Sequence, residues 1–217
     1  MRNFTLLALI LFATQTYAQI TTTITASETG TKIYIDGQYM AEDNYILKIL
    51  WGTCRNVKFE KEGYLAKTVV LCNDKYHAKA GKIYHQTMEK DEAYEASMQD
   101  NVANTEIAIN TPKKEADAWK LLCIIINSYF EIPETQDITS GYMRTAWVSQ
   151  SFNSSTIRTR VILKQSSVDP LQYKVKICSE ISSESGTDVK KDEKFKEWDR
   201  ILRKYNSLIS ELQTRLQ

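Results

Sequence analysis

The run Lys32-Ile33-Tyr34-Ile35-Asp36-Gly37-Gln38-Tyr39-Met40 places β-favouring residues on both sides of an Asp-Gly pair. This pair is typical of the two-residue turn of a β-hairpin, because glycine accepts a positive φ angle there at little cost. Short β-rich runs follow at residues 45–50, 53–60, 64–71 and 82–88, and no window before residue 89 has the period of a helix. The sequence therefore predicts an all-β sandwich of about seven strands over residues 22–89.

The same region resembles a PEGA domain, a small β-sandwich of exported envelope proteins. The resemblance rests on the run from Thr31 to Tyr39 and on the later Phe59-Glu60-Lys61-Glu62-Gly63-Tyr64. Ala41-Glu42-Asp43-Asn44 stands where the family has the tetrapeptide that names it. The resemblance implies a non-catalytic interaction module and brings no site residues with it.

The first residues have the pattern of a secretory signal. Arg2 precedes an apolar run over residues 4–13, and Ala18 offers a small residue at the point of cleavage. We expect a cleaved signal peptide over residues 1–18 and a periplasmic or secreted protein. No cysteine follows the apolar run directly, which argues against a lipid anchor, and no stretch reaches the roughly 20 apolar residues of a membrane span.

Four cysteines remain in an oxidising compartment, where disulfides are stable. A hairpin centred on Gly63 sets Cys54 opposite Cys72 and Val57 opposite Val69. We expect a Cys54–Cys72 disulfide, with two unpaired thiols as the alternative. Cys123 and Cys178 are expected to stay unpaired, because they lie on a helix face turned to the core and on an outer strand face, and a bridge would need a bulge.

The second half predicts an α+β domain over residues 105–217, after a linker or short bridging helix at 90–104. A strand at 105–110 leads to a helix capped by Thr111, with Pro112 in its first position, that ends at about Phe130. The remaining elements are a three-stranded antiparallel sheet and a long C-terminal helix, expected at Gly141–Ser149, Thr156–Lys164, Leu171–Ser179 and Asp192–Leu216.

The C-terminal helix is expected because its apolar residues recur every three or four positions. This spacing also suits a coiled coil, but Ile201 and Leu208 widen the apolar stripe, which favours one helix across its own sheet. The half resembles the helix-grip domains of the accessory lipoprotein of the outer-membrane β-barrel assembly machine. The resemblance rests on an aromatic-led helix, then Ser140-Gly141-Tyr142-Met143-Arg144-Thr145-Ala146-Trp147, then an Arg-bearing strand. The lipid-bearing cysteine of that family is missing.

A cationic sheet face is the favoured binding surface. Strand alternation turns odd-numbered residues inward, with Trp147 opposite Ile157, Met143 opposite Val161, and Val161 opposite Val175. It places Arg144 opposite Arg160 on an outer face without carboxylates, whose ligand-binding residues are Arg144, Arg158, Arg160, Lys174 and Lys176. We expect an envelope protein, acidic glycan or lipid head group there; the alternative is a solvated face neutralised by the first domain, by residues 180–193 or by a partner.

Composition and motifs exclude several classes of function. The 28 Lys+Arg and 27 Asp+Glu give a net charge of +1, which argues against binding nucleic acid through bulk charge. No catalytic motif is present, and neither metal nor cofactor is expected. Cys72, Asp74, His77 and His85 match no recurrent zinc spacing, and a disulfide would remove the thiolate. A non-catalytic binding or scaffolding protein of the cell envelope is favoured; the alternative is an envelope-polymer hydrolase using carboxylates in an interdomain cleft.

Overall fold

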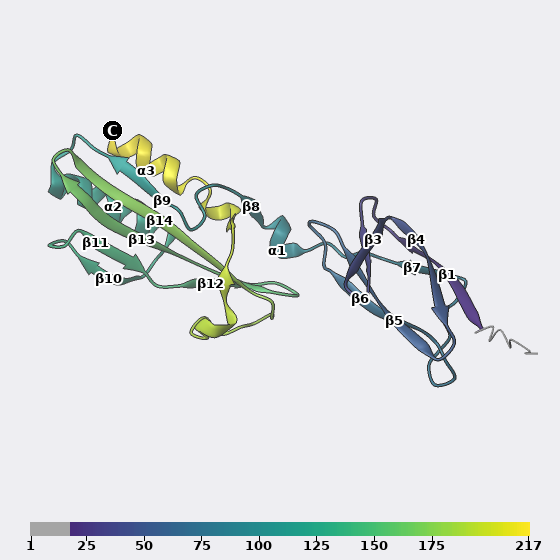
Figure 1. The fold of residues 1–217 in the computed structure, drawn as a ribbon. Helices are drawn as coiled ribbons and strands as arrows, with labels where there is room; N and C mark the ends of the chain where they lie inside the picture. The colour runs from purple at the N-terminus through teal and green to yellow at the C-terminus, as the bar shows by residue number, and fades with distance from the viewer. Residues whose placement is uncertain (1–17) are drawn as a thin grey trace, which may run out of the picture. The chain divides into compact units, whose positions relative to one another are not determined.

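The computed structural model describes residues 18–217, which form a mostly β protein (Figure 1). The chain divides into two compact units, Met1–Glu89 and Lys90–Gln217. The predicted signal peptide lies outside the described residues, apart from Ala18. Among the described helices, none combines the length and the apolar character that crossing a membrane requires.

The first unit consists of two sheets that share one apolar core. One sheet has the order β4-β1-β7 and the other the order β3-β2-β5-β6. Pairing is antiparallel except between β1 and β7. Ile24, Ile49 and Phe59 are among the fully buried side chains of the core. The strands are β1 (Gln19–Ala26), β2 (Lys32–Ile35), β3 (Gln38–Glu42), β4 (Asn44–Leu50), β5 (Thr53–Glu60), β6 (Lys67–Asn73) and β7 (Ile83–Gln86).

The predicted Asp36-Gly37 hairpin is confirmed as the connection between β2 and β3. Both turn residues have positive φ angles, 51° at Asp36 and 87° at Gly37. The carboxylate of Asp36 accepts hydrogen bonds from the backbone N–H of Asn56 and from Arg55, at 2.9 and 2.8 Å. The same two bonds, the backbone one first, lower the pKa of Asp36. The turn is thereby attached to the neighbouring strand β5.

Replacing Gly37 by alanine is expected to lower the free energy of unfolding of the first unit by about 1 kcal/mol, because an L-residue is strained at positive φ. No atom lies within 4 Å of the added Cβ, so the effect isolates backbone strain. Gly81→Ala is the matched control, since Gly81 has no positive φ. Hydrogen exchange of first-unit peptides in the full chain measures both variants, and equal losses would contradict the assignment to strain.

The predicted register of the β5–β6 hairpin is also confirmed. Cys54 faces Cys72 and Val57 faces Val69. The two cysteines form the predicted disulfide, with their Cα atoms 4.0 Å apart. Cys123 and Cys178 are free.

The second unit is built on a seven-stranded sheet, so the predicted sheet of three strands was wrong. The main order is β10-β11-β13-β14-β15, with β12 paired to β13 and β9 paired to β14. The first predicted strand is broken at Ala146-Trp147 into two. The strands are β9 (Glu106–Asn110), β10 (Pro133–Asp137), β11 (Tyr142–Thr145), β12 (Val148–Ser151), β13 (Thr156–Val168), β14 (Leu171–Ser182) and β15 (Lys196–Glu197).

Residues 90–104, expected as a linker or bridging helix, carry the one-turn helix α1 (Glu92–Glu95) and the strand β8 (Ser97–Gln99). Asp91 caps α1 by accepting hydrogen bonds from two backbone N–H groups of its first turn. Ala93 is fully buried, and Met98 packs against the core of the second unit. This segment is therefore held by the second unit.

The helix α2 (Glu115–Tyr129) begins later than predicted. Lys114 occupies the N-cap position, and the hydroxyl of Thr111 instead donates to the carbonyl of Leu216. Pro112 is therefore outside the helix. Trp119, Leu122 and Ile126 are buried on the predicted face.

The predicted long C-terminal helix was wrong, since only α3 (Leu208–Leu216) is α-helical. Asn104 donates to the carbonyl of Trp198 at 2.8 Å, and the Trp198 N–H donates to Ser179 at 3.0 Å. The strand β16 (Arg200–Leu202) then pairs with β8. These partners satisfy the backbone outside a helix, so tertiary contacts outweigh the helical spacing.

The inward alternation of β13 and β14 is confirmed, although the predicted register was wrong. Val161 faces Ile177 instead of Val175, and Met143 faces Leu163 instead of Val161. Both shifts are of two residues, and a shift of two leaves each side chain on the same sheet face. The odd-numbered residues consequently pack in one core with α2 and α3.

Candidate functional site

The predicted cationic face carries carboxylates, so its description as free of them was wrong. Glu134 on β10 lies 2.9 Å from Arg144 and 4.0 Å from Arg160. Glu106 on β9 lies 3.4 Å from Lys174 and faces Lys176 across the β14–β9 ladder. Arg144 faces Ile162 instead of Arg160, so the predicted opposition of two arginines is absent from this ladder.

Glu106 neutralises part of the charge at one edge of this face. Lys164 and Lys174 both contact its carboxylate, Lys164 at 3.0 Å. Hydrogen bonds from these two lysines lower the pKa of Glu106. The ionised carboxylate is therefore favoured beside them, and its single negative charge offsets part of the positive charge of this edge.

Arg158 is buried and is not available to a ligand. Its side chain is 4% exposed. Its guanidinium donates to Glu180 at 2.7 Å, and to Asp192 and the carbonyl of Val189 at 2.6 Å. Arg158 thus links the segment around residues 189–192 to the sheet, so its role is structural.

Trp147 lies in a stack of aromatic rings and guanidinium groups. Arg158 lies between the rings of Phe195 and Trp147, at 4.2 and 4.3 Å from their centres. Arg160 lies 4.1 Å from the centre of the Trp147 ring. Such contacts are attractive because the ring face carries negative charge density. The predicted core pair of Trp147 with Ile157 was wrong.

A change of register explains the orientation of Trp147. Arg144 on β11 faces Ile162, whereas Val148 on β12 faces Thr159, so one extra residue separates the two ladders. An odd insertion moves the following side chains to the opposite face of the sheet. No residue of the Ala146-Trp147 pair signals such a bulge, which is why the alternation pattern did not place Trp147 outside.

Two hollows lie beside Trp147, and both Ala146 and Trp147 line each of them. The first, which we call the Arg160 hollow, has a volume of about 370 Å³ and includes Glu134, Lys190 and Asp192 in its lining. The second, which we call the Tyr205 hollow, has a volume of about 460 Å³ and includes Tyr129, Ile132 and Lys204. The ring of Trp147 therefore borders both a charged hollow and an aromatic one.

The Arg160 hollow contains an incompletely paired guanidinium. The Nε of Arg160 is buried and has no hydrogen-bond partner among the described residues. The Nη1 of Arg160 lies 4.0 Å from Glu134, and that carboxylate is closer to Arg144. The charge of Arg160 is therefore only weakly offset by Glu134, which favours the approach of another carboxylate to this guanidinium.

The lining of the Tyr205 hollow combines aromatic and aliphatic side chains with two charged ones, Glu131 and Lys204. Tyr205 is 3% exposed, stacks on Phe130 and has a pKa raised to about 12 by burial. Lys204 donates to Gln150 at 3.1 Å, and burial lowers the pKa of Lys204. Ile132 is 65% exposed beside them. This combination suits a ligand with one apolar side chain and polar neighbours.

The strand β12 follows Trp147 directly and has one unpaired edge, and its first residue, Val148, lines the Tyr205 hollow. It pairs with β13 on one side, and no other strand of residues 18–217 pairs with it. Ser149 and Ser151 are exposed. An edge of this kind presents backbone N–H and C=O groups that an added strand can bind.

A further hollow of about 810 Å³ lies elsewhere in the second unit, beside β9 and the β13–β14 turn. Asn110, Thr111 and Gln213 line it, and its lining includes no charged or aromatic side chain. Its size exceeds that of the two hollows at Trp147, but it holds no group that would select a ligand.

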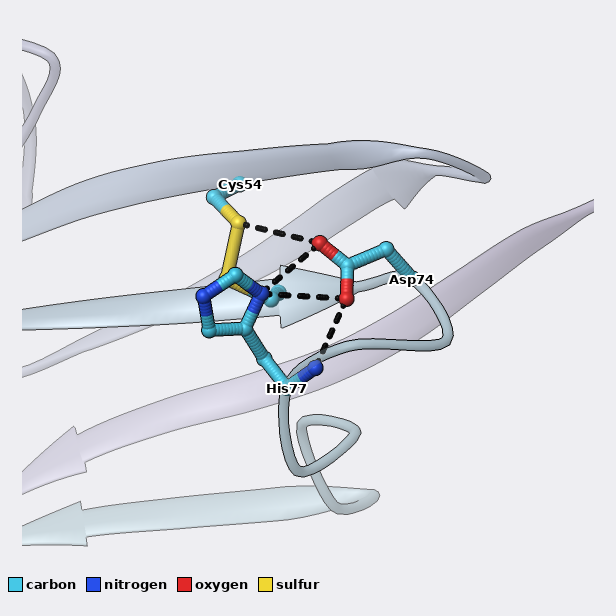
Figure 2. A group of neighbouring side chains, drawn as sticks. Cys54, Asp74 and His77 are labelled. Carbon is cyan, nitrogen blue, oxygen red and sulfur yellow. Dashed lines mark hydrogen bonds and ion pairs between the residues drawn. A yellow bond between two sulfur atoms is a disulfide. The ribbon is translucent and has the colours of Figure 1, made fainter.

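Among the described residues of the first unit, four side chains that could bind a metal lie together at the disulfide (Figure 2). Cys54, Cys72, Asp74 and His77 place their ligand atoms within 4.8 Å of one another. The Nδ1 of His77 lies 2.9 Å from Asp74, and hydrogen bonding by this ring lowers the pKa of Asp74. His85 contacts Thr25 and is not part of this cluster, whereas Cys54, which the spacing argument did not include, is.

The two free cysteines are poor nucleophiles. Cys178 is buried, and Cys123 is half-buried. Burial raises the pKa of both thiols, which lowers the fraction of reactive thiolate.

No protein-family model matches this chain, and a search of curated proteins finds no match. The likeness to PEGA and helix-grip domains consequently rests on the motifs quoted above. The argument for a function has to start from the residues of this chain.

Proposed function

We propose that the chain is an exported, non-catalytic binding protein of the bacterial cell envelope. Its partner is an extended, acidic segment of an envelope protein, which adds to the sheet at β12. We also infer that the first unit is a PEGA-like β-sandwich and serves as an interaction module. The observation that carries the proposal is the unpaired edge of β12, which begins directly after Trp147, the residue that lines both hollows.

Strand addition accounts for the backbone of the partner. An extended peptide at β12 hydrogen-bonds through its main chain, and its alternate side chains reach opposite faces of the sheet. On the outer face, a side chain would meet Trp147 and the Arg160 hollow. Neighbouring positions would meet Ile132 and Lys204 in the Tyr205 hollow. One bound strand thus uses both hollows.

Charge selects the acidic character of the segment. Arg160 and Lys190 line the Arg160 hollow together with Glu134 and Asp192. Those two carboxylates lie closest to Arg144 and Arg158, which leaves Arg160 and Lys190 as the less completely paired charges. These two charges favour Asp or Glu at one position of the segment.

The carboxylates of the Arg160 hollow argue for binding without catalysis. Glu134 lies 2.9 Å from Arg144, and Asp192 lies 2.6 Å from Arg158. Both carboxylates are thus engaged in ion pairs with arginines, which favours a role in holding the sheet face together.

Replacing Trp147 by alanine is expected to weaken binding of an acidic peptide by about 30-fold, the loss typical of a central aromatic residue. A synthetic library of extended acidic peptides supplies the probe, and fluorescence anisotropy of its tightest member measures affinity. Trp51→Ala is the control, because Trp51 is an exposed tryptophan of the first unit. Equal affinities of the two variants would reject the site.

Two further arms separate peptide binding from its rivals. Arg160→Gln is expected to flatten the salt dependence, and N-methylation of alternate peptide amides is expected to abolish binding by an added strand. Anionic lipid vesicles and an acidic glycan are tested beside the peptide. Retention on vesicles or glycan, with no peptide binding, would overturn the choice of an envelope protein as partner.

A further inference from the structure

We propose that reduction of the Cys54–Cys72 disulfide creates a zinc site, in which Cys54, Cys72, Asp74 and His77 bind one Zn²⁺. The disulfide therefore acts as the oxidised, zinc-free state of a redox-gated metal site. This site lies in the first unit and is independent of the binding proposed at Trp147.

The strand pairing keeps both sulfur atoms together after the bond is broken. Cys54 and Cys72 are directly opposed on β5 and β6, with their Cα atoms 4.0 Å apart. Zinc bonds of about 2.0–2.3 Å in a tetrahedron place ligand atoms about 3.3–3.8 Å apart. All four ligand atoms already lie within 4.8 Å of one another. Rotation of the two cysteine side chains and small shifts of the others complete the site.

The loop that carries Asp74 and His77 is held in place independently of the disulfide. The Asp74 carboxylate accepts hydrogen bonds from the backbone N–H groups of Tyr76 and His77, both at 2.9 Å. At the end of the loop, the Ala80 N–H donates to the Cys72 carbonyl at 3.0 Å. The loop therefore closes back on β6.

The side chains of this loop face the sulfur atoms. Figure 2 shows the His77 ring and the Asp74 carboxylate turned toward the disulfide. Asp74 Oδ2 lies 3.6 Å from the sulfur of Cys54. Preformed ligands of this kind lower the ordering cost of binding.

The donor set selects the metal. Two thiolates, one imidazole and one carboxylate match the sulfur, nitrogen and oxygen ligands that zinc takes in tetrahedral sites. Calcium and magnesium need six or more oxygen ligands, which this cluster does not offer. Zinc is therefore the expected occupant of the reduced site.

The redox step balances with a dithiol reductant. The dithiol transfers two electrons and two protons to the disulfide, giving two cysteine thiols and one new disulfide in the reductant. Zn²⁺ then displaces both thiol protons and binds the thiolates. In the reverse direction, a disulfide oxidant accepts the two electrons together with two protons from water and becomes a dithiol, while the Cys54–Cys72 bond re-forms and Zn²⁺ is released.

The test compares the full chain before and after reduction with a phosphine, which is converted to its oxide by taking oxygen from water. Zinc titration against a chromophoric competitor is expected to show one tight site per reduced chain and none per oxidised chain. Cobalt substitution is expected to give a thiolate-to-metal charge-transfer band in the reduced chain. A reduced chain that binds zinc no better than the oxidised one would overturn the proposal.

Variants identify the ligands. His77→Ala is expected to weaken zinc binding at least about 10-fold, since loss of a ligand should cost no less than loss of its supporting partner. His85→Ala is the matched control and is expected to bind as the wild type does. If His77→Ala and His85→Ala bind zinc equally, the assigned site is wrong.

Unfolding on reduction would not leave the question open. In that event, zinc added before the reductant is expected to preserve the native circular dichroism and hydrogen exchange of the first unit. The double variant Cys54→Ser with Cys72→Ser is expected to show no such protection. Failure of zinc to protect the reduced wild type would also overturn the proposal.

Discussion

Replacing Arg158 by alanine is expected to lower the free energy of unfolding of the second unit by about 3 kcal/mol, because it leaves two carboxylates without their buried partner. Arg158 is 4% exposed, while Glu180 and Asp192 are 22% and 82% exposed. Because water can reach both carboxylates once Arg158 is removed, we expect a loss of free energy at the lower end of the range for a broken buried ion pair. The variant also removes the group between Phe195 and Trp147.

Lys174→Ala provides the contrast for Arg158. Lys174 is 45% exposed and pairs with Glu106, so its loss is expected to cost less than about 1 kcal/mol. Denaturant unfolding of the full chain gives the free energies, and hydrogen exchange assigns them to a unit. Faster exchange around residues 189–192 is expected in Arg158→Ala alone. Similar losses in the two variants would show that Arg158 is no more structural than an exposed lysine.

Local turn chemistry explains why the sequence predicted so much of the first unit. The Asp36-Gly37 turn needs residues that accept positive φ, and both have it. Centring a hairpin on Gly63 was enough to align Cys54 with Cys72. Both features depend on residues that are close in sequence, so the local sequence is enough to predict the turn and the strand register.

The C-terminal segment shows where local patterns stop being informative. Phe195 and Trp198 have helical spacing, yet Phe195 stacks on Arg158, and the backbone of Trp198 bonds to Asn104 and Ser179. These partners are distant in sequence and compete with helical hydrogen bonds. A spacing rule cannot weigh contacts that exist only after the sheet has formed.

For the candidate site, the sequence predicted which sheet face most side chains lie on, but it did not predict the residues that surround them. Alternation correctly turned Val161 and Tyr173 toward the core. It could not supply Glu134 and Glu106, because the edge strands β10 and β9 that carry them were not assigned to the sheet. It also missed the one-residue shift that brings Trp147 to the outer face.

Replacing both Cys54 and Cys72 by serine is expected to lower the free energy of unfolding of the first unit by about 3 kcal/mol, from the entropy that the unfolded chain regains. The disulfide closes a loop with a sequence separation of 18 residues. Cys123→Ser is the control for a cysteine substitution, because Cys123 is free and belongs to the second unit. Hydrogen exchange of first-unit peptides measures the loss, and an unchanged first unit would show that the β5–β6 ladder holds without the bridge.

The same loss is expected when the wild-type disulfide is reduced, and this allows the stabilities of the two redox states to be compared. Zinc at 100 times its dissociation constant is expected to return about 2.7 kcal/mol to the reduced wild type, because it binds only the folded site. That gain nearly offsets the loss of the disulfide, so the first unit would remain folded in both states. The double serine variant lacks both thiolates and is expected to gain nothing from zinc. If zinc stabilises that variant as much as the reduced wild type, its effect does not arise at the cysteines.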